Sequence, residues 1–109
     1  MRPDDLDDDA PGSEGALAVE ERPKTERPRR YKVLLHNDDF TTMEFVVEVL
    51  VEHFHKSPAE ATHVMLQVHH RGVGVAGVYP REAAETKVAE VTAAARAAGM
   101  PLMLSLEEE

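Results

Sequence analysis

A short apolar segment that stops abruptly at three polar residues constrains this chain most. Segment 31–36 holds three apolar residues in succession, which is typical of a strand covered on at least one face. Asn37, Asp38 and Asp39 follow directly, and an apolar pattern with helical spacing begins a few residues later. Three side chains that accept hydrogen bonds are therefore expected on a tight turn between two packed elements.

This turn has the chemistry to hold a small cation such as an ammonium group. The amide oxygen of Asn37 and the carboxylates of Asp38 and Asp39 could each accept a charge-assisted hydrogen bond, worth about 1.5–3 kcal/mol. His69, with a neutral ring facing the turn, would add another acceptor. Two alternatives stay open. Asn and Asp are also common in ordinary turns, and His69 falls on an apolar helix line, where it could be a core residue.

The order of apolar patterns and breakers predicts an α+β fold, βααβαβ. Thr41 and Glu44 have the spacing of a capping box at the start of the first helix, and Ser57 and Glu60 repeat that spacing at the second. Gly72 marks the end of the second helix, and Gly74 or Gly77 marks a bend or close approach in the strand that follows. Three antiparallel strands would be covered on one face by three helices. The expected elements after the turn are a helix from 42 to about 54, a helix from 58 to 71, a strand from 72 to 79, a helix from 82 to 98 and a strand from 102 to 106.

The chain divides into a tail and a single small domain. Residues 1–30 hold four prolines, nine acidic and six basic residues and no aromatic side chain, so they cannot bury enough apolar surface to offset chain entropy. We expect disorder there and a folded domain over 31–109.

Composition excludes several function classes. The chain has no cysteine, which removes disulfides and thiol chemistry. A net charge of −9 without a basic stripe argues against a nucleic-acid partner. Neither a membrane span nor a signal sequence is recognisable, so we expect a cytoplasmic location. We also expect a monomer. No nucleophile motif or phosphate loop is present, and neither a cofactor nor a metal site is expected.

Several apolar residues admit two interpretations. Their spacing fits simple core packing, but part of the set could line a pocket, since methionine adapts to side chains of different shape. The set comprises Met43, Val46, Met65, Val68 and Leu102.

Five motifs together resemble the ClpS family, the adaptors that hand N-degron substrates to Clp proteases. They are NDDFTTMEFV at 37–46, MLQVH at 65–69, GVY at 77–79, AETKV at 84–88 and PL at 101–102. They span most of the expected domain in order. Thr42 departs from the family pattern, because many members have proline there.

The resemblance implies a role for each candidate residue. Asn37 and His69 would hold the α-amino group of a substrate, with Asp38 and Asp39 in supporting acidic positions. Met43 would turn away β-branched first residues. Glu82 and Lys87 would dock on the Clp ATPase. The pocket wall for the first side chain would consist of Thr41, Met43, Val46, Met65, Val68 and Leu102.

The implied protein is an adaptor and not an enzyme. It would bind a free N-terminal Leu, Phe, Tyr or Trp and deliver the substrate to the N-terminal domain of a ClpA- or ClpC-type AAA+ ATPase. One alternative is a regulator that docks on the ATPase without binding N-degrons. Another is a small hydrolase or metal protein that uses Asp38, Asp39 and histidines.

Overall fold

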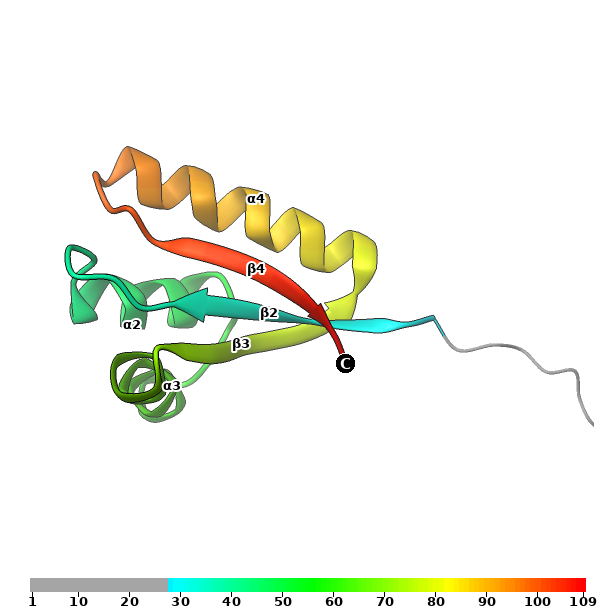
Figure 1. The fold of residues 1–109 in the computed structure, drawn as a ribbon, viewed down its shortest axis with the longest axis horizontal. Helices are drawn as coiled ribbons and strands as arrows, with labels where there is room; N and C mark the ends of the chain where they lie inside the picture. The colour runs from blue at the N-terminus through cyan, green and yellow to red at the C-terminus, as the bar shows by residue number, and fades with distance from the viewer. Residues whose placement is uncertain (1–27) are drawn as a thin grey trace, which may run out of the picture.

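The computed structural model of the protein describes residues 28–109. Its elements follow the expected order βααβαβ (Figure 1). The predicted disorder of residues 1–30 falls almost wholly outside the described residues, while Arg30 already belongs to the first strand. The elements are β2 (Arg30–His36), α2 (Met43–Glu52), α3 (Pro58–Arg71), β3 (Val73–Pro80), α4 (Arg81–Ala97) and β4 (Met103–Glu108).

The three strands form one antiparallel sheet in the order β3-β2-β4. The central strand β2 pairs with β3 through Val33↔Gly77 and Leu34↔Val75. The residue of β3 between these two pairs therefore has no partner on β2. This irregularity is a bulge, and it lies next to Gly77, one of the two glycines at which the sequence predicts a bend or a close approach. The predicted antiparallel sheet is confirmed.

One face of the sheet and the helices enclose the core. Val33 and Leu35, two residues apart on β2, are fully buried, as the alternation of side chains along a strand requires. They belong to one cluster with Leu50 of α2 and Val91 of α4. The opposite face is more open, and there His36 Nε2 and Ser105 Oγ lie 2.6 Å apart. Because the buried face of β2 packs against the helices, the end of this strand lies beside them.

The start of α3 agrees with the predicted capping box. The backbone N–H of Glu60 donates to Ser57 Oγ at 3.2 Å, and that of Ser57 donates to Glu60 Oε1 at 3.0 Å. Gly72 ends the helix with φ of 87°, a left-handed conformation that favours glycine. The last turn of α3 is therefore fixed where β3 begins.

The start of α2 differs from the prediction. The N-cap is Thr42, whose Oγ1 accepts from the backbone N–H of Phe45 at 3.1 Å. The predicted capping box of Thr41 and Glu44 is therefore wrong. Thr41 instead contacts Asp38 in the preceding loop, which places the helix start one residue later and leaves Thr41 in the turn.

Two further features concern the helices. Ala98, the last residue of the helix expected from 82 to 98, lies just beyond the end of α4 at Ala97 and is exposed. Within residues 28–109, no helix is long and apolar enough to cross a membrane.

Candidate ligand-binding cavity

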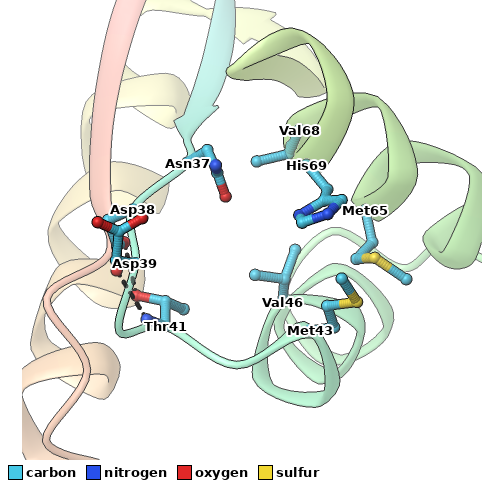
Figure 2. A pocket seen from close by; sticks show the side chains of 9 residues that line it. All are labelled: Asn37, Asp38, Asp39, Thr41, Met43, Val46, Met65, Val68 and His69. Atoms are coloured by element: carbon cyan, nitrogen blue, oxygen red, sulfur yellow. Dashed lines mark hydrogen bonds between the residues drawn. The ribbon is translucent and has the colours of Figure 1, made fainter.

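A cavity of about 280 Å³ opens between the loop after β2, the start of α2 and the second half of α3. Figure 2 shows the loop on one side and the two helices on the other. Its volume lies just below the range of sites for drug-sized ligands, roughly 300–1,000 Å³, so it suits one large side chain. The lining residues are Asn37, Asp38, Asp39, Thr41, Met43, Val46, Met65, Val68 and His69.

Asp38 holds the loop together. Its Oδ1 accepts from the backbone N–H groups of Phe40 at 2.8 Å and Thr41 at 2.7 Å, and its Oδ2 accepts from Thr41 Oγ1 at 2.7 Å. This is an Asx-type turn, in which the side chain takes the place of a backbone acceptor. Asp38 and Asp39 were expected to have similar roles, but the contacts distinguish them, since within residues 28–109 the Asp39 side chain accepts no such bond.

The pKa of Asp38 reflects these contacts. Burial raises the pKa of this carboxyl, but the bonds donated by the Thr41 side chain, the Thr41 backbone and the Phe40 backbone outweigh burial, and the net pKa lies below its ordinary value. Asp38 is therefore ionised at neutral pH and contributes negative charge to the wall. Among the lining residues there is no lysine or arginine, so the cavity favours a cation.

Asn37 and His69 approach the opening from opposite sides. The backbone N–H of Asn37 donates to the carbonyl of Gly72 at 2.9 Å, which ties the end of β2 to the end of α3. His69 lies in the last turn of α3, and Figure 2 shows both side chains directed into the space between the loop and that helix. Residues 32 positions apart in the sequence thus face one ligand site.

His69 is not a core residue. Its side chain is exposed, and its ring meets the ring of His70 edge-on with centroids 5.1 Å apart. Within the described part of the chain, no hydrogen bond engages the His69 ring. Its nitrogens are therefore available to a ligand, which removes the core-histidine alternative.

The deep part of the cavity is apolar. Val46 and Val68 are buried, Met65 is half-buried and Met43 is 43% exposed. Val68 is held by a close approach of β3: a Cβ on Gly74 would lie 2.7 Å from Val68 Cγ2. Both glycines that the sequence singles out allow a close approach: Gly74 packs against Val68, and Gly77, at the bulge, packs against the ring of Tyr79, where a Cβ would lie 2.8 Å from Cε2. Four residues of the set that admitted two interpretations line the cavity, and two of them, Val46 and Val68, also belong to the core.

Leu102 does not belong to this wall. It is 1% exposed, packs in the hydrophobic core and does not line the cavity. An apolar residue just before a strand can face either side, and only the tertiary placement of β4 decides which. Placing Leu102 in the pocket wall is the one departure among the predicted lining residues.

Glu82 and Lys87 lie on α4, away from the cavity. The helix begins beside Pro80, which pairs with the first residue of β2, whereas the cavity loop follows the last residue of that strand (Figure 1). Glu82 is exposed, and Lys87 Nζ donates to the carbonyl of His53 at 2.7 Å. Lys87 thus has a structural contact at the end of α2, which the sequence pattern did not reveal.

Metal binding has no support in the described structure. Within residues 28–109, no group of three or more histidine, cysteine, aspartate or glutamate side chains could hold a metal ion. The histidines are spread along the chain: one on β2, two between α2 and α3, one within α3 and two in the last turn of α3.

Sequence comparison identifies similar proteins over most of the chain. Residues 26–105 match the family model described as ATP-dependent Clp protease adaptor protein ClpS. A ClpS adapter protein of Desulfatibacillum aliphaticivorans is 61% identical over 95 residues, which cover 87% of this chain and 91% of that protein. One from Maricaulis maris is 55% identical over 94% of both chains.

A solved structure has the same fold. Agrobacterium tumefaciens ClpS2, bound to L-phenylalaninamide, superposes with a TM-score of 0.73 at 44% sequence identity. The match covers 76% of this chain and all of that one.

Proposed function

Because the chain belongs to the ClpS family of ATP-dependent Clp protease adaptors, we propose that it binds N-degrons and delivers them to a Clp AAA+ ATPase. The substrate would be a protein with a free N-terminal Leu, Phe, Tyr or Trp. One observation carries this proposal: a single cavity joins hydrogen-bond acceptors at its mouth to an apolar wall inside. An amino-terminal residue presents the complementary pair, an ammonium group next to a side chain.

The mouth of the cavity would hold the α-ammonium group. The amide oxygen of Asn37 and a neutral ring nitrogen of His69 accept two of its protons, while the carboxylates of Asp38 and Asp39 supply negative charge. Bonds of this charge-assisted kind contribute about 1.5–3 kcal/mol each. The phenylalaninamide bound by the Agrobacterium relative has a free amino group beside an aromatic side chain, which supports this assignment.

The apolar wall would hold the first side chain. Burying a Leu or Phe side chain contributes roughly 1.5–3 kcal/mol. Thr41 and Val46 lie at the loop and helix ends of the wall, and Met65 and Val68 line the α3 side. Met43 closes the wall near the mouth and would obstruct a side chain that branches at Cβ.

The expected affinity is moderate. We expect a dissociation constant in the micromolar range, which corresponds to a binding free energy of about −8 kcal/mol. The lost translational and rotational freedom of the peptide opposes the gains and keeps the affinity far from the tightest known complexes. An adaptor must release its cargo, so moderate affinity fits delivery. No chemical step on the substrate is required, and we propose no catalytic residue or cofactor.

Delivery would use a second face. We propose that Glu82 and Lys87 on α4 dock on the N-terminal domain of a ClpA- or ClpC-type ATPase, with the protein acting as a cytoplasmic monomer. Because Lys87 also contacts His53, Lys87→Ala changes both docking and stability, whereas the exposed Glu82 reports docking alone. Binding of Glu82→Ala to an isolated ATPase N-terminal domain, at unchanged melting temperature, tests the face.

A panel of fluorescent peptides that differ only in the first residue tests the proposal. Anisotropy should show binding of Phe and Leu peptides at micromolar concentrations and much weaker binding of Val and Ile peptides. Equal binding of all four would contradict the assignment of the wall. Absence of binding, together with intact docking on the ATPase, would favour a regulator that does not recognise N-degrons.

A further inference from the structure

A second hollow adjoins the binding cavity along α2. Its volume is about 420 Å³, and it is lined by Met43, Glu44, Val47, Glu48 and Met65. Met43 and Met65 line both hollows, and Figure 2 shows these two side chains next to each other at the edge of the first. The two methionines therefore form a shared wall that a bound peptide could cross.

The second hollow combines an apolar floor with acidic edges. Val47 is half-buried, whereas Glu44 and Glu48 are exposed. Residues 44, 47 and 48 are three and four positions apart and so share one face of the helix. Neither lysine nor arginine lines the hollow. Such a surface fits an alkyl chain, and it fits an alkyl chain that ends in a positive charge better still.

A peptide held by its first residue must place its second residue near the mouth of the cavity. Consecutive Cα atoms are about 3.8 Å apart, so a second side chain lies within reach of whatever surrounds the opening. On the α2 side, the opening is bounded by Met43, and the second hollow lies directly beyond it.

Building on the proposed function, we propose that this hollow is a subsite for the second residue of the substrate. It takes a long unbranched side chain: methionine, lysine or arginine. The alkyl part packs on Val47 and the two methionines, which are flexible enough to adapt to it. A lysine or arginine extends its charged end to Glu44 and Glu48 while its stem stays on the apolar floor.

Peptides that differ only at the second residue test this subsite. A peptide beginning Phe-Met should bind about five-fold more tightly than one beginning Phe-Gly, which corresponds to partial burial of one side chain. A peptide beginning Phe-Lys should bind about two-fold more tightly again, because its charged end reaches Glu44 and Glu48. The advantage of lysine over methionine should fall at 1 M salt, where exposed charges are screened within about 3 Å. The Phe-Gly peptide serves as the reference for the first-residue cavity.

Two variants and two controls locate the effect. Val47→Asn should reduce the ratio of Phe-Met to Phe-Gly affinity to near one. Glu48→Gln should reduce the ratio of Phe-Lys to Phe-Met affinity about two-fold. Glu52→Gln removes the same charge one turn along the helix, outside the hollow, and should leave both ratios unchanged. Phe40→Ser alters an exposed residue on the other side of the loop and should also leave them unchanged.

The outcomes separate the subsite from the proposed function. Failure of the Phe-Gly peptide to bind would overturn the proposed function itself. Normal binding of Phe-Gly with equal affinity for every second residue would overturn the subsite alone. The subsite is also overturned if these affinity ratios change in Phe40→Ser but not in Val47→Asn, because the peptide would then leave the cavity over the loop and not over α2.

Discussion

Replacement of Asp38 by alanine should loosen the loop that forms one side of the binding cavity. The carboxylate accepts three hydrogen bonds, at 2.8, 2.7 and 2.7 Å. A net contribution of about 0.5–1.5 kcal/mol per bond gives an upper limit for the loss. Phe40 is exposed and Thr41 only half-buried, so water replaces part of what is lost. We therefore expect a loss of about 1–2 kcal/mol in the free energy of unfolding.

The expected loss of peptide affinity in Asp38→Ala follows from this loss in the free energy of unfolding. Through disorder of the loop, a ligand that needs the ordered loop loses at most the free energy by which the loop is ordered, and about 1–2 kcal/mol corresponds to a factor of roughly 5–30. The lost negative charge of Asp38 adds to this reduction. Peptide anisotropy with a Phe peptide should show this reduction. Thermal unfolding should show a lower melting temperature, by roughly 4–8 °C per kcal/mol for a domain of this size.

Asp39→Ala is the matched control. It removes the same charge from the adjacent residue, whose side chain accepts no hydrogen bond within residues 28–109. Asp39→Ala should weaken peptide binding modestly and leave the melting temperature unchanged. If Asp39→Ala lowers the melting temperature as much as Asp38→Ala, the loss is due to charge and the argument from loop geometry is refuted.

The pH dependence provides a second check on Asp38. Its pKa is lowered in the folded protein, so its contribution to stability is fully present above the unfolded value, about 3.9. That contribution is lost as the pH falls through the lower folded value. Wild-type protein should therefore lose stability relative to Asp38→Ala below about pH 4, and the two stability curves should converge there. A difference that persists unchanged at lower pH would contradict the assigned role.

Four other substitutions test separate parts of the structure. Met43→Ala should admit Ile and Val peptides, because it removes bulk from the mouth of the cavity; unchanged discrimination in the anisotropy panel would count against this. His69→Ala should weaken Phe-peptide binding about ten-fold with no change in melting temperature, since the ring is exposed, and a lower melting temperature with intact binding would restore the core-histidine interpretation. Gly74→Ala should lower the free energy of unfolding, measured in urea, by about 1–3 kcal/mol, because its Cβ would lie 2.7 Å from Val68 Cγ2. An unchanged free energy of unfolding would show that β3 can shift to accommodate the added Cβ. His55→Gly should raise stability by about 0.5–1 kcal/mol, since it relieves a φ of 57° at some cost in unfolded-chain entropy; a decrease would mean that the His55 side chain has a stabilising contact.

The sequence determined the elements where local chemistry was unambiguous. Ser57 and Glu60 form the expected capping box, and the buried pair Val33 and Leu35 follows from strand alternation. The order of elements is confirmed for the same reason, because each element depends on residues close in sequence, which a pattern can reveal. The antiparallel sheet is also confirmed, although it pairs residues far apart in sequence, such as Tyr31 and Glu108. It was expected from the fold class that this order of elements indicates.

Features that depend on competition between neighbours were not predictable. Thr41 and Thr42 can both cap a helix, and the outcome depends on Asp38, which takes the Thr41 hydroxyl and amide for the loop. Leu102 could face the pocket or the core, and only the packing of β4 places it inside. The contact of Lys87 with His53 joins residues 34 positions apart, which a spacing pattern cannot show.

The most direct test of the central claim compares one peptide with and without its N-terminal charge. Acetylation of a Phe peptide removes the positive charge and leaves acceptors such as Asn37 and His69 without donors, while the aromatic side chain is unchanged. We predict that the free peptide binds in the micromolar range and that the acetylated peptide binds at least a hundred-fold more weakly, about 2.7 kcal/mol. Equal affinity for the two peptides would contradict the account, because the cavity would then recognise an apolar side chain and not an amino terminus.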